Sequence, residues 1–147
     1  MKILLATDGS PHSKAALEEV ARRLFPPKTK VRIISAYERE PRIMNVDTIG
    51  VSQEFYAEAA KLALNNAENT TENAAKFLRM KNPALIISTI VIEGSPKSVI
   101  PKEAETFGAD LIVVGAHGQG VVERFLLGSV SLAVALHAKC SVEIVRK

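Results

Sequence analysis

The sequence LIVVGAHGQGVVERFLLGS, at residues 111–129, contains an apolar run, a loop punctuated by glycines and the start of a second apolar pattern. The consecutive apolar residues at its start are typical of a strand that is buried on both faces. Glycines let a backbone approach a ligand closely, and they tolerate positive φ. Unpaired N–H groups at the start of a helix attract anions, phosphate above all. The stretch therefore predicts a buried strand, a ligand-binding loop and a helix N-terminus in succession.

The rest of the chain repeats this alternation of strand and helix patterns. Short apolar runs predict strands at residues 3–6, 31–37, 85–92, 111–114 and 142–145. The segments between these runs predict helices. An α/β chain with this order implies a parallel sheet that is covered by helices on both faces, with right-handed crossover connections.

The first helix has clear start and stop signals. Ser10 fits an N-cap and Pro11 a first helical position. Pro26-Pro27 would stop the helix. Apolar residues follow one another at helical spacing between these signals. They are Leu17, Val20, Ala21 and Leu24.

A long helix follows a segment without periodicity. Residues 38–51 predict a long loop, and loops of this length in compact domains are often functional. Ser52 can cap the helix, and Asn82-Pro83 ends it. We expect its apolar face to include Phe55, Ala59, Leu62, Ala63, Ala67, Ala74, Phe77 and Leu78.

The third helix contains a proline. Residues 94–96, Gly-Ser-Pro, predict a cap and a helix start, and Gly108 predicts the end. A proline inside a helix removes a hydrogen bond and clashes with the preceding turn. Pro101 therefore implies either an irregular first turn or a helix that begins near Ile100. The last helix is predicted from Val130, Ala133, Val134 and Leu136.

The composition excludes several classes of protein. The chain has 147 residues, of which 47% are apolar and 24% charged, as in an ordinary globular domain. No apolar run approaches the ~18 residues of a membrane span, and the N-terminus lacks the pattern of a signal peptide. One cysteine cannot form an internal disulfide, so we expect a cytoplasmic protein. The net charge of +3 comes from scattered basic residues, so we expect no nucleic-acid partner.

The glycine loop resembles the nucleotide-binding signature of the universal stress protein family. Residues 115, 118 and 128 fit G-x2-G-x9-G, and Ser129 follows. Residues 2–10, which contain Asp8 at the end of an apolar run, resemble the first strand of that family. Residues 108–115 and 128–145 also fit the family. Because these segments span nearly the whole chain, residues 1–147 are identified as a single domain of this family.

The resemblance implies a fold and a partner. The expected fold is doubly wound, with strand order 3-2-1-4-5, similar to the adenine nucleotide alpha-hydrolases. In this order the first and fourth strands are neighbours, so Asp8 and Gly115 meet at the crevice where open α/β sheets bind ligands. The last strand commonly pairs with its symmetry mate in this family, which implies a homodimer. Members often have proline where this chain has Ser141, and Glu143 could blunt the edge instead.

The resemblance also implies a site for ATP or another adenine nucleotide. Asp8 would hold the ribose or a phosphate-bound Mg²⁺, the backbone at Ala36 the adenine, and Ser129 phosphate oxygens. A basic residue often stands in the family where this chain has Gln119, so one phosphate partner is missing here. The implied nucleotide-binding residues are Thr7, Asp8, Gly9, Ala36, Gly115, His117, Gly118, Gly128, Ser129, Val130 and Ser131.

Each of these residues also has an ordinary structural interpretation. Asp8 could cap a turn, and Ser129 could be a helix N-cap. His117 could contact phosphate, although a loop histidine more often faces solvent. The spacing of His12, His117 and His137 suggests no zinc site. We expect Cys140 to be a small buried residue rather than a nucleophile.

The expected function is binding and stress-response regulation, with ATP hydrolysis slow at most. The chain shows no general base, nucleophile or arginine finger arranged for phosphoryl transfer. The alternative is a nucleotide-free interaction module of the same fold. A receiver domain would need a phosphoacceptor Asp after the third strand, where this chain has residues 93–95, Glu-Gly-Ser. An enzyme that uses Asp8 and His117 is a further alternative.

Overall fold

The computed structural model describes residues 1–39, 53–118 and 127–147. Its elements follow the predicted alternation: β1 (Lys2–Ala6), α1 (Pro11–Arg22), β2 (Lys30–Tyr37), α2 (Gln53–Lys81), β3 (Ile86–Glu93), α3 (Pro96–Phe107), β4 (Leu111–Gly115), α4 (Ser129–His137) and β5 (Ser141–Val145). The strands form one parallel sheet in the order β3-β2-β1-β4-β5. The predicted fold class and strand order are confirmed.

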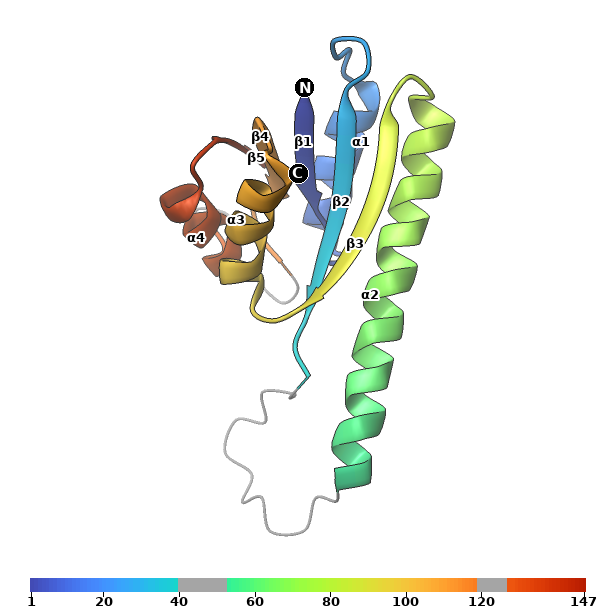
Figure 1. The fold of residues 1–147 in the computed structure, drawn as a ribbon, viewed down its shortest axis with the longest axis vertical. Helices are drawn as coiled ribbons and strands as arrows, with labels where there is room; N and C mark the ends of the chain where they lie inside the picture. Colours follow the sequence, from blue (N-terminus) through green and yellow to red (C-terminus); the bar gives the residue numbers. More distant parts are fainter. Residues whose placement is uncertain (40–52, 119–126) are drawn as a thin grey trace.

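The helices cover the two faces of the sheet in pairs. In Figure 1, α1 and α2 lie on one side of the sheet, and α3 and α4 lie on the other. Because successive side chains of a strand point to opposite faces, β1 contributes to both cores. Ile3 and Leu5 pack with α1 and α2, whereas Leu4 packs with α3 and α4. All three are fully buried, as the apolar run predicts.

The first helix begins where predicted and ends earlier. The Ser10 hydroxyl accepts a hydrogen bond from the Ser13 N–H at 3.2 Å, which confirms the N-cap. Arg23 already has extended backbone angles. The Asn82 side chain donates to the carbonyls of Ala21 and Arg23, so a partner from outside the helix satisfies its last turn. Leu24 lies beyond the helix and is 95% exposed, so its assignment to the apolar face is wrong.

An ion-pair network joins α1 to the strand at the sheet edge. Arg23 donates to both carboxylate oxygens of Glu143 on β5 and to Glu19 one turn earlier in the chain. These two carboxylates raise the pKa of Arg23, Glu143 more than Glu19. Arg23 and Arg22 in turn lower the pKa of Glu19. Glu143 therefore contacts α1, which the sequence pattern did not indicate.

The long helix extends far beyond the sheet. A helix of 29 residues is about 44 Å long, whereas a strand of 8 residues spans about 26 Å. Its buried residues are Ala67, Thr71, Ala74, Ala75 and Leu78, all in the second half.

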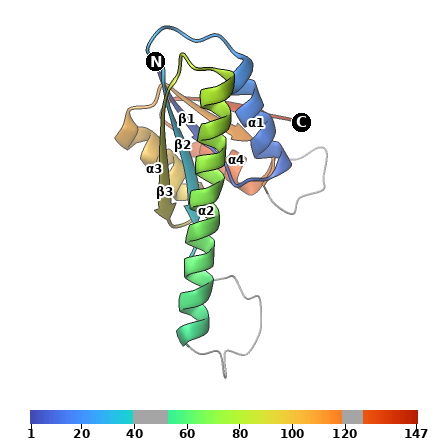
Figure 2. The same ribbon diagram turned by 90° about the vertical axis from the view of Figure 1, so that its right-hand side faces the viewer.

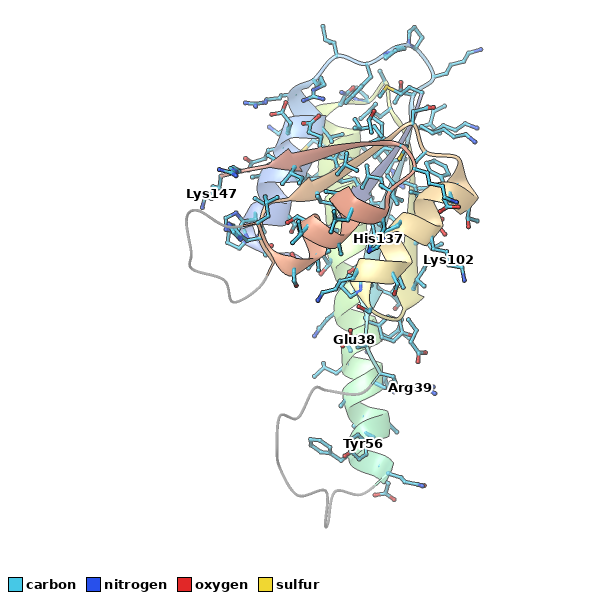
Figure 3. All side chains as sticks on the ribbon, turned by 90° about the vertical axis from the view of Figure 1, so that its left-hand side faces the viewer. Glu38, Arg39, Tyr56, Lys102, His137 and Lys147 are labelled. Atoms are coloured by element: carbon cyan, nitrogen blue, oxygen red, sulfur yellow. The ribbon has the colours of Figure 1, made fainter. Side chains whose placement is uncertain are left out.

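Figure 2 shows the first half of α2 projecting past the sheet, and Figure 3 places Tyr56 on this projection. Phe55 and Leu62 are 54% and 62% exposed, so the prediction that they belong to the buried face is wrong. The sheet is too short to cover them. The predicted cap Ser52 and residues 40–51 of the predicted loop lie outside the described residues.

The third helix begins before its internal proline and continues through it. It begins at Pro96 and includes Pro101, so the prediction of a start near Ile100 is wrong. The first turn is closed by two bonds to the Ser95 carbonyl, from the N–H groups of Ser98 and Val99. Gly108 ends the helix in the left-handed conformation at φ 68°, as predicted. In α4, Val134 is buried but the predicted face residue Leu136 is exposed.

A buried ion pair connects β2 to α3. Arg32 donates to Glu103 at 2.6 Å, and the two side chains are 29% and 7% exposed. The Arg32 guanidinium also lies 4.1 Å from the centroid of the Phe107 ring. Burying a carboxylate is costly unless it is paired, so this contact fixes where α3 sits on the sheet.

We predict that Glu103→Ala lowers the free energy of unfolding by about 1–3 kcal/mol, because Arg32 loses its partner but keeps Phe107 and some solvent. Urea unfolding followed by circular dichroism measures the change. Glu105→Ala is the matched control, since Glu105 is exposed on the same helix and pairs with Lys139. This control is expected to change stability by less than about 0.5 kcal/mol. Equal losses in the two variants would contradict the role of the buried pair.

Candidate functional site

A pocket lies at the carboxyl ends of the central strands, on the face covered by α3 and α4. It holds about 550 Å³ of atom-free space, including the part that is open to solvent. Open α/β sheets bind ligands at this place, where the strand order reverses between β1 and β4. The described residues that line it are Ala6, Thr7, Asp8, Ser13, Ile34, Ala36, Pro96, Ile100, Val114, Gly115, His117, Gly118, Val130 and Ser131.

One part of the pocket is apolar. Ile34 and Ala36 come from β2, Val114 from β4, and Pro96 and Ile100 from the first turns of α3. The Ile34, Ile100 and Val114 side chains are buried, so they form a fixed wall rather than a mobile one. A wall of this kind suits a flat, largely apolar ring.

The turn after β1 brings Asp8 to the pocket. Asp8 Oδ1 accepts a hydrogen bond from the Ser10 N–H at 2.9 Å. This carboxylate therefore caps the turn that follows β1, which is its ordinary structural interpretation. Its Oδ2 would lie 3.1 Å from a Cβ built on Gly118, so Asp8 and the glycine loop are in contact. The same carboxylate can therefore cap its own turn and still face the loop.

The hydroxyls near Asp8 are occupied by local bonds. Thr7 Oγ1 donates to Ser13 Oγ at 3.2 Å and accepts the Gly9 N–H at 3.3 Å. Ser10 caps α1 through its own side chain. The N-terminus of α1 is thus satisfied by the protein itself and is not an open anion site.

The glycines of the loop are required by close packing. A Cβ on Gly115 would lie 2.6 Å from the backbone carbonyl of His12. A Cβ on Gly128 would lie 3.1 Å from the Ala116 carbonyl oxygen and from the His117 Cα. Neither glycine has a positive φ, unlike Gly9 at 77°. Close backbone approach, not left-handed backbone geometry, explains these two positions.

No described side chain caps the N-terminus of α4. Gly128 is the N-cap residue and has no side chain to offer, so the prediction of Ser129 as N-cap is wrong. Ser129 is the first helical residue and is exposed. Within the described residues the N–H groups of the first turn therefore have no side-chain partner, and the helix dipole favours negative charge there.

The Ala116 carbonyl holds this helix end in place. The Gly128 N–H donates to it at 2.8 Å, and the Ser131 hydroxyl donates to it at 2.9 Å. Ser131 also donates to the Gly128 carbonyl at 2.9 Å, and its side chain is buried. The start of α4 is therefore fixed against the first residue after β4.

Most of the predicted site residues meet in the pocket. Eight of them line it, namely Thr7, Asp8, Ala36, Gly115, His117, Gly118, Val130 and Ser131. Gly9 instead lines a separate cavity between α1 and α2. Gly128 and Ser129 belong to the end of α4 and are not among the lining residues. Gln119, where members of the family often have a basic residue, lies outside the described residues.

Sequence reasoning named Ala36 but missed Ser13 and the rest of the apolar wall. Ile34 is the residue two before Ala36 on β2, and alternation along a strand puts both on one face. That signal could have found Ile34. Pro96 and Ile100 belong to α3, and only the packing of this helix on the sheet brings them to the pocket.

Two side chains differ from the predictions in their exposure to solvent. His117 is half-buried rather than solvent-facing, and its ring contacts the His12 ring with 5.0 Å between centroids. Cys140 is half-buried rather than buried, and desolvation raises the pKa of its thiol. A thiol with a raised pKa is a poor nucleophile at neutral pH.

The described residues hold no group of three or more His, Cys, Asp or Glu side chains that could bind a metal ion together. Asp8 by itself would bind Mg²⁺ only together with phosphate oxygens. Among the helices in the described part of the chain, none has the length and apolarity needed to cross a membrane.

Comparison with known proteins relates the chain to one family. The model of the universal stress protein family matches residues 1–146. A putative universal stress protein from Staphylococcus epidermidis is 33% identical over 98% of this chain and 82% of its own length.

Solved structures agree in fold. The hypothetical protein MJ0577 superposes with a TM-score of 0.84 at 28% identity over 99% of this chain and 95% of its own. An Arabidopsis thaliana family protein with AMP bound gives 0.69 at 18% identity, with 100% and 92% covered. A universal stress protein in complex with cAMP gives 0.59 at 24% identity, with 99% and 96% covered. The full-length family match and the curated relative together establish that this chain belongs to the universal stress protein family.

Proposed function

We propose that this protein binds ATP or another adenine nucleotide and acts as a regulatory stress-response protein. The observation that carries the proposal is the uncapped N-terminus of α4 beside an apolar pocket. One end of such a site suits phosphate and the other suits a purine. Two structural neighbours that bind AMP or cAMP support the choice of adenine nucleotides.

Each part of the nucleotide has a suitable place in the pocket. The phosphates would lie against Gly118 and the first turn of α4, where Ser129 and Val130 present their N–H groups. The adenine would lie against the apolar wall, with the backbone of Ala36 as its polar contact. Asp8 would hold the ribose hydroxyls, or a Mg²⁺ ion that the phosphates also bind.

The pocket lining favours binding over turnover. Among the described lining residues, Asp8 and His117 are the ionisable acid and base, and no Lys or Arg accompanies them. Phosphoryl transfer relies on cations that stabilise charge in the transition state. We therefore expect ATP hydrolysis to be slow at most. The single cysteine suits a cytoplasmic setting.

We predict that adenine nucleotides raise the melting temperature of the protein. A ligand at a hundredfold excess over its dissociation constant stabilises the native state by about 2.7 kcal/mol, which corresponds to roughly 5–10 °C for a domain of this size. ATP with Mg²⁺ and AMP should each bind more tightly than adenosine, because the end of α4 recognises phosphate. Calorimetry measures the affinities.

Mass spectrometry of the freshly purified protein adds a direct test for a retained nucleotide. Equal affinities for AMP and adenosine would refute the assignment of the phosphate site. If ATP and AMP cause no shift and no heat, the nucleotide-free interaction module becomes the better description.

Gly128 offers a test of the phosphate position. Gly128→Asp should abolish ATP binding, because a carboxylate would occupy the phosphate position and repel it. The backbone φ of −62° suits any residue, and a carboxylate at a helix N-terminus is stabilising by roughly 0.3–1 kcal/mol. The domain should therefore stay folded, with a circular dichroism spectrum like that of the parent.

Gly128→Ala separates charge from crowding. Its Cβ meets the Ala116 carbonyl oxygen at 3.1 Å, so the loop must shift slightly, but no charge is added. We expect a smaller loss of ATP affinity than with Asp. An Asp variant that binds ATP within threefold of the parent would show that Gly128 only packs the loop.

The open edge of β5 supports the proposal of a homodimer. Among the described strands, β5 has one neighbour, β4, which lies on one side of it. The Val145 carbonyl accepts the Ala116 N–H, so the backbone of Val145 faces inward. Because backbone groups alternate along a strand, Val142 and Ile144 present theirs at the open edge. Glu143 is held by Arg23, just after the end of α1, so it does not oppose a second β5.

Light scattering is expected to give twice the chain mass of 15.9 kDa for the parent protein. Val142→Pro should give a monomer, since proline removes an edge N–H without breaking a bond to β4. Circular dichroism checks that the variant is folded. A folded variant that keeps the dimer mass would exclude the β5 edge as the interface.

A further inference from the structure

Two histidines that are far apart in the sequence meet beside the glycine loop. His12 lies in the first turn of α1, and His117 lies just after the end of β4. Their rings are 5.0 Å apart between centroids, with an angle of 70° between planes. Gly115 allows this contact, because a Cβ there would collide with the His12 backbone. The fold therefore holds the two imidazoles in a defined arrangement.

Both rings carry a buried nitrogen that has no partner among the described residues. Among the described residues, Nδ1 of His12 and Nδ1 of His117 are the buried side-chain polar atoms that lack a hydrogen bond. Buried polar atoms normally have a partner, and an exception calls for an ion, a water or another cause. One ion bound by both neighbouring rings would give both nitrogens a partner. In a neutral imidazole, the unprotonated nitrogen offers the lone pair that metal ions bind.

The spacing of the rings suits a single ion between them. Zn²⁺ binds an imidazole nitrogen at about 2.0–2.1 Å, and the ring centre lies about 1.1 Å further on. Two imidazoles on one tetrahedral ion therefore have centroids about 5.2 Å apart. The observed separation of 5.0 Å is close to this value.

We propose that His12 and His117 form a site for a transition-metal dication of the Zn²⁺ class. Imidazole nitrogen suits Zn²⁺, Co²⁺, Ni²⁺ and Cu²⁺, whereas Mg²⁺ prefers oxygen ligands. Within the described chain no third protein ligand joins the pair, so water fills the other positions. Two histidines bind more weakly than the four protein ligands of a closed structural zinc site.

This site is separate from the Mg²⁺ that Asp8 and phosphates would hold. It is made of nitrogen ligands, and it needs no nucleotide. His117 also lines the pocket, so the ion would lie at one wall of it. The competing explanation is an edge-to-face contact of two imidazoles, with a water at each nitrogen and no metal.

Titration of the metal-free protein with Co²⁺ in excess Mg²⁺ tests the proposal, with visible absorption as the readout. We expect saturable 1:1 binding and displacement by Zn²⁺. His12→Ala and His117→Ala should each weaken binding at least tenfold. His137→Ala is the matched control, because His137 is exposed at the far end of α4, beside Lys102 (Figure 3). It should bind Co²⁺ like the parent.

A second variant guards against loss of binding through misfolding. His117→Cys keeps a ligand at the site and should add a thiolate-to-Co²⁺ charge-transfer band in the near ultraviolet. His137→Cys should not produce this band. Absence of saturable Co²⁺ binding in the parent overturns the proposal and leaves the imidazole contact as a packing feature. Equal affinity in the parent and both alanine variants overturns it as well. Neither result affects nucleotide binding, which is measured separately.

Discussion

The site of this protein depends on one carbonyl group. The backbone oxygen of Ala116 accepts hydrogen bonds from the Gly128 N–H and the Ser131 hydroxyl, and so joins the two ends of the glycine loop. Because the sheet fixes Ala116 through β4, the bonds also fix where α4 begins. The first turn of α4 then lies at the carboxyl ends of β1 and β4, and none of the described side chains caps it. A helix start that its loop holds in place, with no cap from the described side chains, is the arrangement on which the proposed phosphate site rests.

Local signals in the sequence predicted the sheet well. The apolar runs gave strands of nearly the observed length, because a strand buried on both faces needs an uninterrupted run. Asp8 and Gly115 were placed together by the strand order, which came from the family resemblance. The turn signals at Ser10, Asn82 and Gly108 were also confirmed, since each lies at the helix end that it predicted.

The features that the sequence could not predict depend on contacts between distant parts of the chain and on the relative lengths of neighbouring elements. The burial of α2 is limited by the length of the strands beside it, so periodicity alone could not show which half packs. Pairs such as Arg32 with Glu103, or His12 with His117, join residues more than seventy positions apart and leave no local pattern. Ser129 failed as a cap because Gly128 takes that position, which only backbone angles reveal. Pro96 and Ile100 of the apolar pocket wall were missed because α3 reaches the pocket only by packing on the sheet.

The uneven burial of α2 divides one continuous helix into two parts with different local stability. No residue between Gln53 and Asn66 is buried, whereas five are buried from Ala67 to Leu78. Helix propensity alone supports a segment of about 14 residues only marginally. The free energy of opening should therefore rise along the helix, from fraying at Gln53 to global unfolding near Leu78. We expect amide hydrogens of the projecting half to exchange with solvent long before those of the packed half. The one continuous helix would then behave as two cooperative units in solution.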